Sequence, residues 1–361
     1  MMRKICTRLL VTMLAASALT ACAGNAATTS SVPESSAVAV ASVTESAAST
    51  EQSSAKVKTG LAVLTSNAKS TDVGEKDGAA KSDSVVAAVM LGEDGKILAC
   101  TIDVLQSTIN FSKEGKILTD LATVFKTKQE LKEEYGMKNV SKIQKEWFEQ
   151  ANFLSAYVIG KTVEEVKGIA VDEKGVPTDA ELTASITVKI PDYIVAIEKA
   201  ASNAVETSAS SKDSLGLALV NNIAKSKDAG EKDGLAQTYT TYAAVTVGVD
   251  GKITSCLLDA SQANVNFDVA GKITTDLSAT VKTKNELKTD YGMQKSSKIG
   301  KEWYEQAASY ATYVVGKTAD EISDIAIDEK GKATDSELLA SVTVSIGDFN
   351  EVVAKAIANA K

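Results

Sequence analysis

The chain has 361 residues, of which 44% are hydrophobic and 24% are charged, as expected for a globular protein of about two domains. It contains no histidine, which excludes histidine-ligated metals and every Ser-His or Cys-His nucleophile pair. Its net charge of −8 argues against a nucleic-acid partner. We therefore predict a protein that is not an enzyme.

The N-terminal segment is typical of an export signal. Arg3, Lys4 and Arg8 precede a short apolar run at residues 9–19 that ends in Leu-Thr-Ala-Cys22. These four residues resemble the bacterial lipobox, in which the cysteine is acylated before the signal is removed. The resemblance implies a signal peptide at residues 1–21, lipidation of Cys22, and an extracytoplasmic protein that is anchored by its lipid to the cell membrane or cell surface.

Two segments have the composition of tethers. Residues 22–59 are rich in Ala, Ser and Thr and lack aromatic side chains, so they have little apolar surface to bury, and we predict a disordered tether. A shorter Ala/Ser-rich stretch follows residue 200 and is compatible with a linker or with the end of a helix.

The rest of the chain is a tandem repeat. Residues 60–205 align with residues 216–361 without a gap at an offset of 156 positions. Between Tyr135 and Asp192, 34 of 58 positions are identical in the second copy, which establishes a duplication. We predict two similar domains at these boundaries, joined by a linker at residues 206–215.

Each copy begins with hairpin signals and continues with helix signals. Asp94-Gly95 and Asp250-Gly251 lie between β-branched apolar runs, as in tight hairpins. Helix caps follow at Thr-x-x-Glu sequences, and glycines stand at predicted helix ends. The capping threonines are Thr127, Thr162, Thr283 and Thr318, and the terminal glycines are Gly136, Gly160 and Gly292.

The second half of each copy predicts further elements. Residues 142–159 have helical spacing, which favours a core position for Trp147 and its counterpart Trp303. Residues 182–190 and 338–346 alternate as strands do, and we expect Asp192 and Asp348 to cap a final helix. The mixed order predicts an α+β fold in which each copy has a mostly antiparallel sheet with packed helices.

Three other groups of residues have simpler explanations in the fold than in catalysis or metal binding. Ser66 and Lys69 have the spacing of some acyl enzymes, but Asn222 replaces the serine in the second copy. The repeated aspartates fit turns better than a calcium loop. Cys100 and Cys256 occupy equivalent strand positions, where buried free thiols are favoured over a disulfide or a reactive thiol.

A further resemblance suggests a function. The Asp-Gly-Lys-Ile sequences that begin at Asp94 and Asp250, and the segments at 179–187 and 335–343, resemble the FMN-binding domain of bacterial extracytoplasmic flavoproteins. The resemblance implies FMN as a cofactor, esterified to Thr187 and Thr343, in an electron carrier that needs a flavin transferase and a membrane redox partner. It also implies FMN-binding roles for the remaining motif residues, Asp179, Ser185, Asp335 and Ser341.

The alternative is a cell-surface binding or structural lipoprotein without a cofactor, which recognises a small molecule, a glycan or a protein. The two Gly-Glu-Lys-Asp-Gly loops, at residues 74–78 and 230–234, are its first candidate sites, because recurrent surface loops often carry binding residues.

Overall fold

The computed structural model describes residues 56–361, which form an α+β fold with antiparallel sheets. The signal peptide, Cys22 and almost all of the predicted tether lie outside the described residues. In the first copy the elements are β1 (Lys58–Ser66), β2 (Gly78–Leu91), β3 (Ile97–Phe111), α1 (Lys128–Leu131), η1 (Lys132–Tyr135), η2 (Met137–Asn139), α2 (Trp147–Tyr157), α3 (Val163–Lys167), α4 (Ala180–Thr183), α5 (Pro191–Ser202) and β4 (Val205–Glu206).

Apart from η2 and β4, the second copy repeats this order at the offset of 156 residues. Its elements are β5 (Ser214–Asn222), β6 (Gly234–Val247), β7 (Ile253–Phe267), α6 (Lys284–Leu287), η3 (Lys288–Tyr291), α7 (Trp303–Tyr313), α8 (Ala319–Ser323), α9 (Ser336–Leu339) and α10 (Gly347–Ala358). Each begins and ends 156 residues after its counterpart in the first copy. The substitutions that accumulated since the duplication therefore left the bounds of these helices and strands unchanged.

Each copy folds its three long strands into an antiparallel meander. The sheet orders are β3-β2-β1-β4 and β5-β6-β7. Gly95 and Gly251 have φ of 75° and 78° in the predicted hairpin turns, a region that glycine enters without strain. The two hairpins predicted from Asp-Gly are therefore confirmed.

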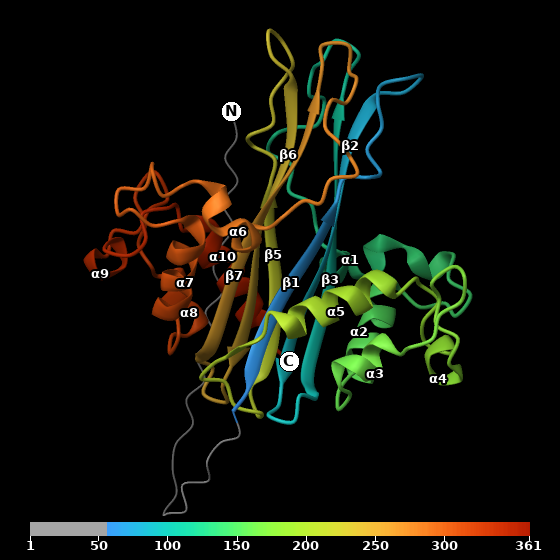
Figure 1. The fold of residues 1–361 in the computed structure, drawn as a ribbon, viewed down its shortest axis with the longest axis vertical. Coiled ribbons are helices and arrows are strands. Elements are labelled where there is room, and N and C mark those ends of the chain that lie inside the picture. The colour runs from blue at the N-terminus through green and yellow to red at the C-terminus, as the bar shows by residue number, and fades with distance from the viewer. Residues whose placement is uncertain (1–55) are drawn as a thin grey trace, which may run out of the picture. The chain divides into compact units, whose positions relative to one another are not determined.

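The two sheets pack against each other, and the helices cover their outer faces (Figure 1). The cluster between the sheets joins Leu61, Val86 and Met90 of the first copy to Leu217 and Tyr242 of the second. Separate clusters lie between each sheet and its own helices. Trp147 and Trp303 are 1% and 3% exposed there, which confirms their predicted core positions. The two copies therefore share part of their hydrophobic core.

Helix α5 crosses β1 at very short range. A Cβ added to Gly60 would lie 1.9 Å from the carbonyl oxygen of Ala200, and one added to Gly216 would lie 2.0 Å from that of Ala356. Only glycine allows the helix backbone to lie directly on the strand. This close approach places the end of α5 beside the outer edge of β1, and the end of α10 beside that of β5.

Local helix signals are mostly confirmed. The four predicted threonine caps each form a complete capping box with the glutamate three residues later. The predicted helix at 142–159 is shorter, because α2 begins at Trp147 after its own box between Glu146 and Glu149.

Two predictions about the closing segment of each copy are wrong. Residues 182–190 and 338–346 are not strands, but the ends of α4 and α9 followed by loops. Here Gln150 Oε1 accepts the N–H of Thr187 at 2.8 Å, so a side chain takes a backbone donor that a strand would use for pairing. Asp192 and Asp348 are not caps, because α5 and α10 begin one residue earlier, after Ile190 and Ile346.

Candidate functional site

Two equivalent clefts lie at the junction between the copies, and each has a volume of about 850 Å³. We name each after its buried aspartate. The Asp259 cleft lies between β1 and α5 of the first copy and β7, α6 and α7 of the second. The Asp103 cleft reverses these roles, since β3, α1 and α2 come from the first copy and β5 and α10 from the second. Neither copy alone forms a complete cleft.

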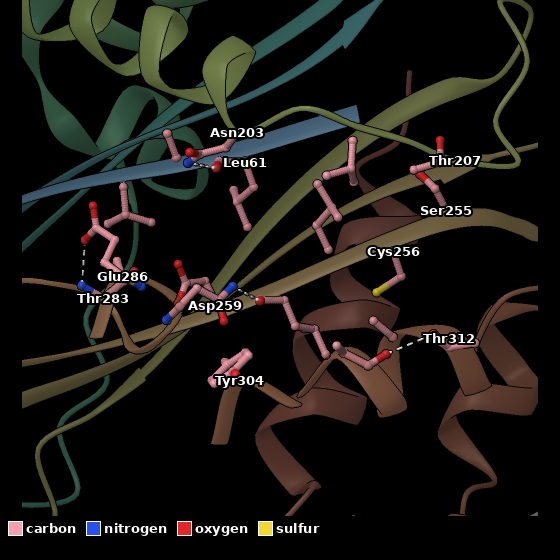
Figure 2. A pocket seen from close by; sticks show the side chains of 18 of the residues that line it. Leu61, Asn203, Thr207, Ser255, Cys256, Asp259, Thr283, Glu286, Tyr304 and Thr312 are labelled. Carbon is pink, nitrogen blue, oxygen red and sulfur yellow. Dashed lines mark hydrogen bonds between the residues drawn. The ribbon is translucent and has the colours of Figure 1, made fainter. Parts of the chain in front are cut away.

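One wall of the Asp259 cleft is the outer edge of β1 (Figure 2). Asn203 Nδ2 donates to the carbonyl of Leu61 at 3.0 Å, and Lys199 Nζ donates to that of Val63 at 2.7 Å. The equivalent donors of the Asp103 cleft are Asn359, which reaches the carbonyl of Leu217 at 3.0 Å, and Lys355, which reaches that of Leu219 at 2.9 Å. Side chains from α5 and α10 thus cap carbonyls along both strand edges.

The opposite wall of the Asp259 cleft consists of β7 and one side of α7. Residues 254–259 all line it, as do Tyr304, Thr312 and Val315. Tyr304 extends from α7 toward the strand in Figure 2, and the hydroxyl of Thr312 donates to the carbonyl of Ala308 on the same helix. The lining combines apolar side chains with a few polar groups, which is the usual composition of a ligand pocket.

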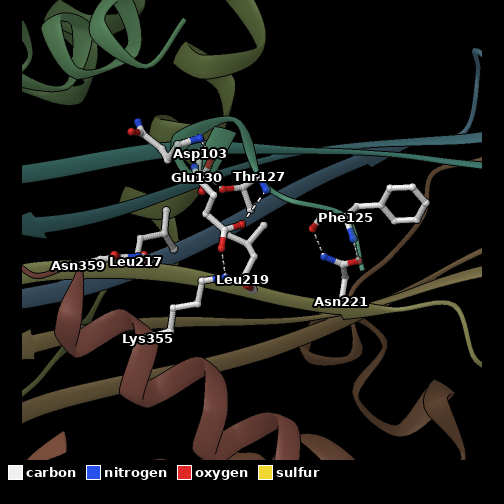
Figure 3. A network of polar contacts seen from close by, with 10 residues as sticks. Asp103, Phe125, Thr127, Glu130, Leu217, Leu219, Asn221, Lys355 and Asn359 are labelled. Atoms are coloured by element: carbon white, nitrogen blue, oxygen red, sulfur yellow. Dashed lines mark hydrogen bonds and ion pairs between the residues drawn. The ribbon is translucent and has the colours of Figure 1, made fainter. Parts of the chain in front are cut away.

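An ion pair between the copies borders each cleft. Lys199 Nζ lies 2.6 Å from Glu286 Oε1, and Lys355 pairs with Glu130 in the equivalent position (Figure 3). Burial alone would raise the pKa of Glu286, but the hydrogen bonds from Lys199 and from the N–H of Thr283 hold this pKa below its usual value. The glutamate therefore stays ionised and paired across the junction.

The buried aspartates hold the first turn of the helices beside them. Asp103 Oδ1 accepts from the N–H groups of Val104 and Gln129, and Asp259 Oδ1 accepts from those of Ala260 and Asn285. Burial raises the pKa of Asp103 to about 7 and that of Asp259 to about 6, although these hydrogen bonds oppose the shift. Their hydrogen bonds make them structural anchors.

The aspartates were not identified from the sequence. Asp103 and Asp259 each stand inside an apolar strand at equivalent positions, and a charged residue retained there is the signal that could have revealed them.

Cys100 and Cys256 are free thiols and line the two clefts. Burial raises the pKa of each thiol to about 12. The thiolate is the reactive form, so both cysteines are protonated and unreactive at neutral pH. This confirms the prediction of free rather than disulfide-bonded cysteines.

The predicted flavin residues lie elsewhere. The hydroxyl of Thr187 donates to Gln150 Oε1 at 3.3 Å, and that of Thr343 donates to Gln306 Oε1 at the same distance. Neither threonine lines a junction cleft. The other four motif residues have local partners: Asp179 and Asp335 cap α4 and α9, Ser185 accepts from Lys145, and Ser341 donates to the carbonyl of Leu338.

The predicted Gly-Glu-Lys-Asp-Gly loops lie at the end of the sheets, away from the clefts. The residues just before the first loop contact the other copy, since Val73 N–H donates to the carbonyl of Gly271 and Asp72 accepts from the N–H of Ile273. Glu75, Lys76 and Asp77 at its tip are exposed. The structure thus gives the base of this loop a role in holding the copies together.

Comparison with family models, with curated proteins and with solved structures finds no match to this chain. Among residues 56–361, no helix has the length and apolar character needed to cross a membrane. The same residues contain no group of three or more cysteines and carboxylates arranged to hold a metal ion.

Proposed function

We propose that this chain is a non-catalytic binding protein with two ligand sites, one in each junction cleft. The observation that carries the proposal is that the same cleft occurs twice, at equivalent positions and with the same volume of about 850 Å³. Ligand sites usually occupy about 300–1,000 Å³ and occur at interfaces between structural units.

The polar groups of the clefts favour binding over catalysis. The buried aspartates already accept two backbone N–H groups each, and the thiols are protonated at neutral pH. Lys199 pairs with Glu286, and Lys355 pairs with Glu130. Because these side chains are engaged by the protein itself, a ligand would be held by the shape of the cleft, by apolar contact and by backbone groups. The lipid predicted at Cys22 would keep both sites at the outer surface of a membrane.

The experiment fills each cleft separately. Ala156 and Thr312 are equivalent exposed residues on α2 and α7, and each lines one cleft. The full chain is screened against a small-molecule library by thermal shift, and the stoichiometry of each hit is measured by calorimetry. We expect about two sites in the original chain, one in Ala156→Trp or Thr312→Trp, and none in the double variant.

A matched control separates filling of the cleft from the addition of a tryptophan. Glu351→Trp changes an exposed residue of α10 that lines neither cleft, and it should leave the stoichiometry unchanged. Hits that bind the double variant as well as they bind the original chain would refute the proposal.

A further inference from the structure

The outer edge of β1 is paired at both of its ends and open in the middle. At one end β4 adds to it, with Thr59 opposite Val205, and at the other end Thr65 forms an antiparallel bridge with Val281. Leu61 and Val63 lie between these pairings and line the Asp259 cleft. A strand-like neighbour is thus present on either side of a short gap.

The open stretch presents backbone donors to the cleft. The carbonyls of Leu61 and Val63 point outward, because they accept from Asn203 and Lys199. In an antiparallel strand, the N–H and C=O of one residue point to the same side, so both N–H groups also face the cleft. Within residues 56–361 neither N–H has a hydrogen-bond acceptor. Each carbonyl keeps a second lone pair for a further donor.

The facing strand also presents its edge. A strand that lines a cavity with one face contributes alternate residues, whereas β7 contributes six consecutive residues, 254–259. Within residues 56–361, β7 pairs with β6 and forms isolated bridges at Ser261 with Thr283 and at Phe267 with Ile273, so residues 254–259 pair with no strand other than β6. The Asp259 cleft is therefore a gap between two sheet edges.

The Asp103 cleft has the same construction. The backbone of Leu215 exchanges two hydrogen bonds with Lys361 at one end of β5, and the side chain of Asn221 bonds the backbone of Phe125 at the other. Leu217 and Leu219 lie in the open stretch between them, and their carbonyls are capped by Asn359 and Lys355. The open stretch is thus present in both copies, so it is a feature of the shared fold.

The charges at the clefts indicate an uncharged occupant. Lys199 pairs with Glu286, and Lys355 pairs with Glu130, so the charges beside the open strand edges balance within the protein. The other lysines that line the clefts, Lys288, Lys132 and Lys361, are exposed and stay hydrated. Val315, which is 40% exposed, adds apolar surface beside Leu61 and Val63, whose side chains are buried. An inserted charge would have no free partner among these pairs and would lose its hydration.

We infer that each cleft binds an extended, uncharged polypeptide segment, which adds as a short strand to the open edge of β1 or β5. On one side of an extended peptide the carbonyls recur every second residue, which is also the spacing of the N–H groups of Leu61 and Val63. The carbonyls of a bound peptide can therefore accept from both N–H groups. Lys199 and Asn203 shield this edge from other chains in solution, as edge lysines do, while leaving its donors free. The inference rests on the proposed function, because it specifies the ligand of the same clefts.

The test uses a fluorescein-labelled five-residue peptide of alternating Val and Thr with blocked ends, at a concentration where it remains monomeric. Two further forms of the peptide carry N-methyl groups on every second amide. The first form is methylated at the odd-numbered amides and the second at the even-numbered amides. With the full chain we expect two peptides bound, loss of binding in the Ala156→Trp/Thr312→Trp double variant, and at least tenfold weaker binding of one methylated form. Amide exchange at Leu61, Val63, Leu217 and Leu219 should slow on binding.

Three outcomes overturn the inference. If library hits bind the clefts but the peptide does not, the peptide inference fails and the proposed function stands. If both methylated forms bind as tightly as the parent peptide, main-chain pairing is refuted. Absence of both peptide and library binding would refute the inference together with the proposed function.

Discussion

Phe111 and Phe267 stack with their ring centroids 4.2 Å apart and their planes 9° apart. They are equivalent residues at the ends of β3 and β7, and both are fully buried in a cluster with side chains from both copies. The contact joins each copy to the other through the same side chain. It therefore stabilises the junction from which both clefts are built.

Removing one ring should destabilise the whole described unit. We expect Phe111→Ala to lower the free energy of unfolding by about 3–5 kcal/mol, because it leaves a cavity and an unstacked partner. Urea unfolding followed by circular dichroism measures the change. Val249→Ala, at a site that is 95% exposed, is the control and should change stability little. An equal loss in both variants would contradict this role of the stack.

The glycines beneath the helices should tolerate no side chain. In Gly60→Ala the new methyl group would overlap the Ala200 carbonyl oxygen, so α5 must move off β1, and we expect a loss of about 2 kcal/mol or more. Gly74 has open space around it and no positive φ, which makes Gly74→Ala the matched control. Thermal unfolding of the two variants compares them directly. A Gly60→Ala chain as stable as the control would refute the close approach.

The buried aspartates predict a dependence of stability on pH. An unfolded aspartate has a pKa of about 3.9, whereas burial raises the pKa of Asp103 to about 7 and of Asp259 to about 6. Between these values the folded chain binds more protons than the unfolded chain, so stability falls as the pH rises from about 4 to 7. We expect the two groups together to contribute a decrease on the order of 5 kcal/mol over this range.

The variant Asp103→Asn/Asp259→Asn isolates this contribution. Asparagine keeps an oxygen that can accept the same two N–H groups but does not titrate. Urea unfolding at pH 4.5 and 7.5 should show a smaller pH difference in the double variant than in the original chain. Equal differences in the two proteins would show that the aspartates do not titrate as described.

The ion pair between the copies should be worth more than an exposed one. Lys199 and Glu286 are 28% and 33% exposed, whereas Lys56 and Glu206 are 71% and 58% exposed. Double-mutant cycles to alanine should give a coupling energy of about 1 kcal/mol for the first pair and near zero for the second. A coupling near zero at Lys199 would mean that the pair positions the helix without stabilising the junction.

Flavin attachment at Thr187 and Thr343 stays a prediction with a direct test. The chain is exported together with a flavin transferase and examined on a denaturing gel for flavin fluorescence, with intact mass as confirmation. The carrier hypothesis expects a fluorescent band that is lost stepwise in Thr187→Ala and Thr343→Ala. A dark band of unmodified mass would refute covalent attachment without affecting the test of the clefts.

The features that the sequence predicted correctly depend on neighbouring residues. Asp94-Gly95 forms its turn because glycine accepts a positive φ, and Thr127 caps its helix through a residue three positions away. The closing segment was mispredicted because its conformation depends on Gln150, which lies 37 residues before Thr187. Alternating hydrophobicity could not reveal that partner.

The clefts depend on contacts between the copies and could not be read from either copy. The duplication was visible at once in the sequence, but how two similar sheets pack is set by side chains such as Leu61 and Tyr242, which meet only in the folded chain. The capped edge of β1 depends in the same way on Lys199 and Asn203, more than 130 residues later in the chain.

Fusion of the copies has a consequence for evolution. In a symmetric homodimer each substitution appears at both equivalent sites, so the sites change together. Here both halves are encoded separately, and a change at Thr312 leaves Ala156 as it was. If the clefts bind ligands as we propose, one chain can therefore keep one cleft for its original ligand while the other adapts to a different one.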